Sequence, residues 1–94
     1  MATEVIQTRI LRTIYFNRRP MDVWSLCTKT HLSVQQIHRG IVNLRQRGLV
    51  KKVQVRRKAG FGKPPIVKIL VYANEKEDYR IRKLLMEAQE NSQQ

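Results

Sequence analysis

One short segment of the chain, residues 32–50, combines an apolar stripe with a row of hydrogen-bonding side chains. Ile37, Ile41 and Leu44 recur at spacings of four and three, which places them on one face of a predicted helix. At about 100° per residue, the opposite face is formed by Gln35, Arg39, Val42 and Gln46, with Gln36 and Asn43 on its flanks. Arginine can bind guanine through two hydrogen bonds, and glutamine or asparagine can do the same for adenine. We therefore predict base contacts from Gln35, Gln36, Arg39 and Asn43.

A polar helix face alone does not decide the function, because many solvated helices carry glutamine and arginine on their outer side. The charge distribution adds a second observation. The net charge is +12, and residues 23–74 contain eleven lysines and arginines and no acidic residue. Such a field repels itself unless a polyanion is the usual partner. The basic segment is not a long amphipathic helix of the kind that lies on a bilayer, so nucleic acid is the predicted partner.

Eight other cations of this segment, with two polar residues of the predicted helix, suit phosphate contacts, which supply affinity without sequence information. We predict contacts to the nucleic-acid backbone, or from a hairpin loop, for Ser33, His38, Arg45, Arg47, Lys51, Lys52, Arg56, Arg57, Lys58 and Lys63. If about six to eight phosphates are neutralised, the logarithm of the binding constant should fall against the logarithm of salt concentration with a slope of about −5 to −7.

Three helices are predicted to position these side chains. A stripe of isoleucines one turn apart predicts a helix over residues 3–17. Pro20 suits the first turn of a second helix over residues 20–30. The third helix, residues 33–47, begins at Ser33, a good amino-terminal cap, and ends before Gly48, where a left-handed residue is expected.

The period then changes to the alternation of strands. Residues 50–72 predict a β-hairpin whose nine-residue loop, RKAGFGKPP, is basic and contains two glycines and two prolines. A last helix over residues 75–90 is predicted to be capped by Asn74, with Glu77 as its capping-box partner. The apolar stripe of this helix consists of Ile81, Leu84, Leu85 and Ala88.

This order of elements resembles that of the winged helix–turn–helix family. The family's core pattern is similar to the residues at Leu26, Cys27, Leu32, Ser33, Ile37, Ile41, Leu44, Gly48, Leu49 and Val50. The turn between the second and third helices often has glycine where this chain has His31, so His31 is expected to tolerate a positive φ. The resemblance implies an α+β fold with a three-helix core, a hairpin wing and a C-terminal helix, in a single domain over residues 1–94.

The same resemblance implies a sequence-specific transcriptional regulator of double-stranded DNA, acting as a repressor. Residues 33–47 would enter the major groove, and the loop 56–65 would meet the minor groove or the backbone. Phe61 would either wedge at a base step or fold back on the domain. Small relatives of this class commonly pair through terminal helices, which predicts a homodimer through the apolar stripe of the last helix. The alternative is that this stripe closes the domain's own core.

Other classes of function find little support in the sequence. A single cysteine excludes an internal disulfide, and one Cys with two His cannot supply four zinc ligands. Cys27 and His31 are four residues apart, but they occupy a core position and the turn, so neither a metal nor a cofactor is expected. No nucleophile–base pair suggests an enzyme. The longest apolar run is far shorter than a membrane span, so a cytoplasmic protein, at the nucleoid when bound, is expected.

Two alternatives to the DNA-binding regulator stay open on the sequence. The first is an RNA- or ribosome-associated winged helix, for which the chain has few aromatic residues likely to form an exposed stacking platform. The second is a protein-interaction subunit of a larger nucleic-acid complex, whose basic surface meets an acidic partner protein.

Overall fold

In a computed structural model, which describes residues 3–92 and the side chains of residues 3–88, the chain has an α+β fold. The described part contains four α-helices and one antiparallel hairpin, with a short 3-10 turn before the last helix. In chain order these are α1 (Thr3–Asn17), α2 (Val23–Thr30), α3 (Val34–Gln46), β1 (Val50–Arg57), β2 (Ile66–Ala73), η1 (Glu75–Glu77) and α4 (Asp78–Ser92).

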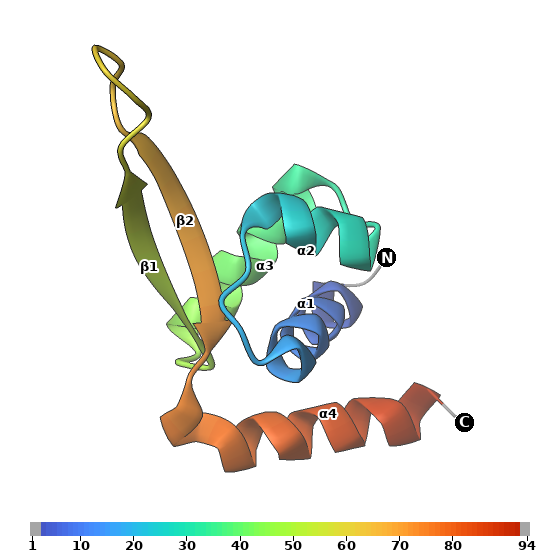
Figure 1. Cartoon of the computed structure of the whole chain (residues 1–94). Helices are drawn as coiled ribbons and strands as arrows, with labels where there is room; N and C mark the ends of the chain where they lie inside the picture. The colour runs from blue at the N-terminus through green and yellow to red at the C-terminus, as the bar shows by residue number, and fades with distance from the viewer. Residues whose placement is uncertain (1–2, 93–94) are drawn as a thin grey trace.

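The first three helices form a bundle, the hairpin rises beside α3 and projects beyond the helices, and α4 runs past one end of α1 (Figure 1). The projecting hairpin makes the molecule elongated, with extents of 57 × 28 × 21 Å. Within residues 3–92, no helix combines the length and the apolarity that crossing a membrane requires.

The core is formed by aliphatic side chains from every helix and from the base of the hairpin. The helices contribute Ile10, Leu11, Ile14, Leu26, Ile37, Ile41, Leu44, Ile81 and Leu85, and the connecting segments and strands contribute Met21, Leu32, Leu49, Val50 and Val71. The predicted stripes of the first and third helices therefore both face inward. The range predicted for the first helix, residues 3–17, coincides with α1, and the third helix lies within its predicted range, residues 33–47.

Helices α1 and α3 approach closely at Gly40. A Cβ atom on Gly40 would collide with Cδ1 of Ile10, a residue of α1 that is completely buried. The absence of a side chain at Gly40 therefore lets the two helices pack directly against each other.

The second helix begins later than predicted. Met21 is extended and pairs with β2 through two hydrogen bonds. The Met21 N–H donates to the carbonyl of Val71 (2.9 Å), and the Val71 N–H donates to the carbonyl of Met21 (2.8 Å). Asp22 then caps α2, because its carboxylate accepts a hydrogen bond of 2.7 Å from the N–H of Ser25. Pro20 is therefore outside the helix, since the chain first uses Met21 to join the hairpin to the bundle.

The two strands pair in register from Val50 opposite Ala73 to Arg57 opposite Ile66. The hairpin begins at Val50, as predicted, and ends at Ala73, one residue beyond the predicted range of residues 50–72. The predicted last helix is divided, because Asn74 accepts a hydrogen bond from the N–H of Lys76 and caps η1, while α4 starts only at Asp78. Glu77, the expected capping-box partner, instead forms an ion pair of 3.2 Å with Arg80.

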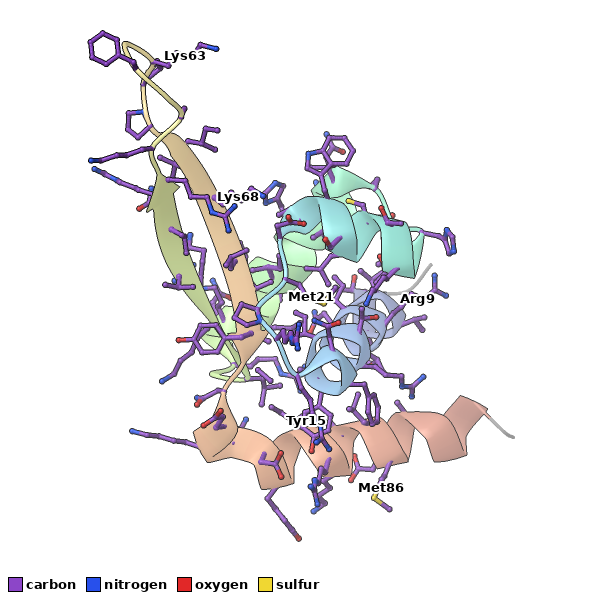
Figure 2. All side chains as sticks on the ribbon, in the orientation of Figure 1. Arg9, Tyr15, Met21, Lys63, Lys68 and Met86 are labelled. Atoms are coloured by element: carbon purple, nitrogen blue, oxygen red, sulfur yellow. The ribbon has the colours of Figure 1, made fainter. Side chains whose placement is uncertain are left out.

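Helix α4 is attached to α1 by a polar contact as well as by its apolar stripe. The Tyr15 hydroxyl donates to Asp78 (2.8 Å) and accepts from Nε of Arg82 (2.7 Å), and Arg82 also pairs with Asp78 (3.0 Å). Figure 2 shows Tyr15 between the two helices. The Tyr15 hydrogen bond and the Asp78 charge both raise the pKa of Arg82.

Candidate nucleic-acid interface

Helix α3 begins with a reciprocal pair of hydrogen bonds at Ser33. The Ser33 hydroxyl accepts from the N–H of Gln36 (3.2 Å), and the Gln36 side-chain oxygen accepts from the N–H of Ser33 (2.9 Å). Ser33 is thus the predicted cap. Gln36, which we predicted to contact a base, is half-buried and its side chain stabilises the helix start. The spacing Ser-x-x-Gln is the sequence signal that indicates this second task.

Helix α3 ends at Gln46, and Gly48 follows it in the left-handed conformation that was predicted for this position. Gly48 has a φ of 77°, its N–H donates to the carbonyl of Arg45, and the N–H of Leu49 donates to the carbonyl of Leu44. These two bonds satisfy carbonyls that the last turn leaves free, and the buried side chains of Leu44 and Leu49 accompany them. The sharp stop turns the chain directly into β1.

The turn between α2 and α3 depends on His31. This residue has φ 59° and ψ 25°, in the left-handed region, and its N–H donates to the carbonyl of Cys27. The expectation of a positive φ at this position is confirmed. Leu32, the next residue, is buried in the core and places Ser33 at the start of α3.

The face of α3 opposite the core is open to solvent. Gln35, Arg39, Val42 and Gln46 are all exposed along it. His38 and Arg45 are exposed on one flank, whereas Asn43 on the other flank is half-buried. Next to Asn43, the exposed Arg47 donates a hydrogen bond of 3.1 Å to Gln7 of α1. The predicted base-contacting residues are thus divided: Gln35 and Arg39 are free on the open face, while Gln36 and Asn43 face their own protein more closely.

Strand β1 runs beside α3, and its side chains alternate between two sides of the hairpin. The side that contains the buried Val50 and Val71 is called the helix side. The alternation places Lys52, Gln54 and Arg56 on the helix side. The outer side carries Lys51, Val53, Val55 and Arg57 from β1 and Lys68 from β2.

This alternation in β1 is the reverse of what burial of apolar groups would produce. Val53 and Val55 point to the outer side, and the polar residues between them share the side of the helices. Strand β2 carries aliphatic residues on both sides, including the exposed Val67 and Ile69 on the helix side. The sequence indicated that the side chains alternate, but only the contact of Val50 and Val71 with the core determines which set lies next to α3.

The hairpin loop places its cations at the far end of the molecule. Gly60 and Gly62 both have positive φ, of 112° and 78°, and the N–H of Lys63 donates to the carbonyl of Gly60 (3.3 Å). Phe61 between them is fully exposed and does not fold back on the domain. Figure 2 shows Lys63 near the tip and Lys68 lower on β2.

Two hollows flank the open face of α3. One, of about 610 Å³, lies between the end of α3 and the hairpin base, and its lining includes Arg45, Lys51, Lys52, Tyr72 and Asn74. The other, of about 690 Å³, lies between α1 and α3, with Gln7, Arg39 and Asn43 in its lining. The first hollow gathers three predicted phosphate contacts from two elements, and all three side chains are exposed.

The four residues predicted to form a dimer interface occupy a different position. Ile81 and Leu85 are buried in the chain's own core, Leu84 packs against that core, and Ala88 is half-buried. In the structure this stripe closes the domain's own core, which is the alternative that the sequence left open. Ile81 and Leu85 are therefore closed to a partner in this conformation.

Comparisons with protein-family models and with curated proteins found no match for this chain. Within residues 3–92, no three His, Cys, Asp or Glu side chains lie close enough together to hold a metal ion. The function proposed for this chain therefore depends on geometry and charge alone.

Proposed function

We propose that this protein is a winged helix–turn–helix regulator that binds double-stranded DNA with sequence specificity. The observation that carries the proposal is the reversed alternation of β1 beside the open face of α3. Lys52, Gln54 and Arg56 share the side of the hairpin on which the helices lie. At the hairpin base, Lys51 and Lys52 line one hollow together with Arg45 and Gln46 of α3. A polyanion in that space would be contacted by α3 and the hairpin together.

In the proposed complex α3 lies in the major groove, which is wide enough to admit a helix. Gln35 and Arg39, in the first half of α3, are the base-reading residues, since residues near the amino-terminal end of a recognition helix contact base edges. Arg45, Lys51 and Lys52 hold phosphates at the hairpin base. Arg56 meets the adjacent backbone or minor groove, where narrow A·T tracts attract cations.

As a regulator, the protein would act as a repressor by occupying a promoter. Gel-shift titrations with duplex DNA, duplex RNA and single strands, using a sequence selected from a random pool, test the proposal. We expect the selected duplex DNA to bind most tightly. Arg39→Ala should weaken binding to it by about 1–3 kcal/mol and relax the preference at one base pair.

The hairpin offers a matched pair of variants. Arg56 and Arg57 are adjacent and both exposed, but they project to opposite sides of the hairpin. We expect Arg56→Ala to weaken every duplex about equally and to reduce the salt slope by about 1, whereas Arg57→Ala has a smaller effect. Tighter binding to RNA than to DNA, or equal losses from both variants on all sequences, would count against this docking geometry.

A homodimer through the terminal helices is part of this proposal, with a changed set of contacts. Because Ile81 and Leu85 are buried, the pairing would use other, exposed side chains of α1 and α4, among them Phe16 and Met86. Sedimentation with and without the selected duplex measures the stoichiometry. A Phe16→Asp variant that stays paired on DNA would exclude this surface.

A further inference from the structure

Val42 occupies the middle of the open face of α3 and is not among the apolar side chains that pack against the core. Its side chain is 49% exposed, with Arg39 one turn before it and Gln46 one turn after it. Valine is a weak helix former, so its presence at a solvated position does not help α3 to form. Single exposed valines are common on protein surfaces, and Val5 of α1, which is 48% exposed, is one. Val42 differs from Val5 because it lies among the residues that are proposed to read bases.

The chemistry of an isopropyl group restricts what Val42 can recognise. It has no hydrogen-bond donor or acceptor, so it cannot read the polar atoms of a base edge. In the major groove, the apolar feature that distinguishes one base is the C5 methyl group of thymine. A 5-methylcytosine presents a methyl group on the same ring carbon.

The spacing along α3 relates this contact to that of Arg39. At 1.5 Å per residue, Arg39 and Val42 are separated by about 4.5 Å along the helix axis. Successive base pairs are about 3.4 Å apart. Arg39 and Val42 can therefore face the same base pair, or base pairs one to two steps apart.

We propose that Val42 is a specificity-determining residue that contacts the methyl group of a 5-methylpyrimidine within two steps of the guanine bound by Arg39. This inference rests on the proposed function. Covering one methyl group and part of the valine surface corresponds to a preference of about fourfold for thymine over uracil.

Single-atom changes in the DNA test this inference. In the duplex selected by the purified protein, each thymine is replaced in turn by uracil, which removes only the methyl group. We expect one replacement near the Arg39-dependent guanine to weaken binding about fourfold, and the other replacements to have smaller effects. Cytosine at that position should bind more weakly than 5-methylcytosine by a similar factor.

Two variants locate the effect on the protein. Val42→Ala should bind the thymine and uracil duplexes equally, because the alanine side chain is too short to cover the methyl group. Val5→Ala removes a valine of matched exposure from α1 and should keep the full preference. Circular dichroism melting verifies that both variants are folded.

The possible outcomes separate this inference from the proposed function. If no duplex is selected and none is bound specifically, the proposed function itself fails. If a duplex is bound specifically but tolerates uracil at every position, or if Val42→Ala keeps the same uracil sensitivity as the unmodified protein, the role of Val42 is excluded and DNA binding stands.

Discussion

His31 is a residue whose backbone conformation would suit glycine. Its φ of 59° places it in the left-handed region, its side chain is exposed, and its N–H is held by the carbonyl of Cys27. This region costs an L-residue about 1–2 kcal/mol relative to ordinary helical geometry, although histidine tolerates it better than a β-branched residue. The turn between α2 and α3 therefore contains local strain.

Replacing His31 with glycine should stabilise the fold. The relief of strain exceeds the added entropy of the unfolded chain, so we expect the free energy of unfolding to rise by about 0.5–1 kcal/mol. Urea denaturation followed by circular dichroism measures this change. His31→Ala is the control, because it removes the imidazole and keeps the strain, and a gain in that variant would show that the backbone is not the cause.

Asp22 gives the stability of α2 a dependence on pH. The hydrogen bonds from Ser25, with a smaller contribution from the charge of Lys68, lower the pKa of Asp22 in the folded protein. Its stabilising effect is therefore present above the unfolded pKa of about 3.9 and is lost as the pH falls through the folded pKa. We expect Asp22→Ala to cost about 1 kcal/mol at pH 7, and the difference from the unmodified protein to shrink below pH 4.

The matched variant for this effect is Asp22→Asn. Asparagine caps helices about as well as aspartate but does not titrate, so its difference from alanine should stay constant between pH 7 and pH 3. As the pH falls, the stability of the unmodified protein relative to the alanine variant should decrease, and that of Asp22→Asn should not. An equal decrease for both would mean that another group titrates. Thermal melts at a series of pH values supply the comparison.

Local rules predicted several residues of the site from the sequence. Ser33 and Gly48 have short-range tasks, capping a helix start and a helix end, that depend on their own chemistry and the neighbouring backbone. Gln36 was predicted to contact a base, but the same amide can also accept a hydrogen bond at the start of the helix. The Ser-x-x-Gln spacing favours this capping hydrogen bond. The pairing of Met21 with Val71 could not be predicted locally, since the two residues are far apart in sequence.

At the scale of elements, the contact between α1 and α3 depends on the missing side chain at Gly40. Alanine would improve the helix propensity of α3 by about 1 kcal/mol, but its Cβ would collide with Cδ1 of the fully buried Ile10. Overpacking of a core typically costs about 1–3 kcal/mol. We expect Gly40→Ala to destabilise the protein by about 1 kcal/mol net.

A double-mutant cycle checks this explanation. Ile10→Val removes the colliding Cδ1 atom and should cost about 0.5–1.5 kcal/mol alone. Combined with Gly40→Ala, it should cost less than the sum of the two single changes, with a coupling of at least about 0.5 kcal/mol. Strict additivity in chemical denaturation would mean that Gly40 is required for another reason.

The hairpin illustrates what a strand pattern can and cannot predict. The alternation of Val53 and Val55 with Gln54 and Arg56 is visible in the sequence and predicts a strand. Which set lies beside α3 depends on Val50 and Val71, because their burial sets the parity of both strands. Burial of apolar groups alone would place Val53 and Val55 on the side of the helices. In the structure Gln54 and Arg56 lie on that side, and Gln54 therefore joins the candidate site.

At the scale of the whole molecule, charge makes the strongest prediction about binding. The net charge is +12, and the cations of the open face and the hairpin are exposed. If about six to eight phosphates are neutralised, the logarithmic dependence of DNA affinity on salt concentration should have a slope of about −5 to −7. Fluorescence anisotropy between about 50 and 300 mM salt, at constant pH, measures it. A slope flatter than about −2 would exclude extensive phosphate contact.

The apolar stripe of α4 shows the limit of sequence reading at this scale. The spacing of Ile81, Leu84 and Leu85 predicts that one face of the helix must be covered, and it is. Periodicity carries no information on whether the covering surface belongs to the same chain or to another. Here α4 lies against α1, and the Tyr15 contacts with Asp78 and Arg82 fix its orientation.

The two hydrogen bonds between Met21 and Val71 have a consequence for the proposed complex with DNA. They fasten the hairpin to the same bundle that carries α3, so the distance between the two is set by the protein and does not adjust freely. In the proposed complex, a duplex whose groove spacing differs from that fixed span would have to bend or twist to fit. Easily deformed steps such as TA and CA should then be enriched between the contacted positions, where no side chain reaches a base.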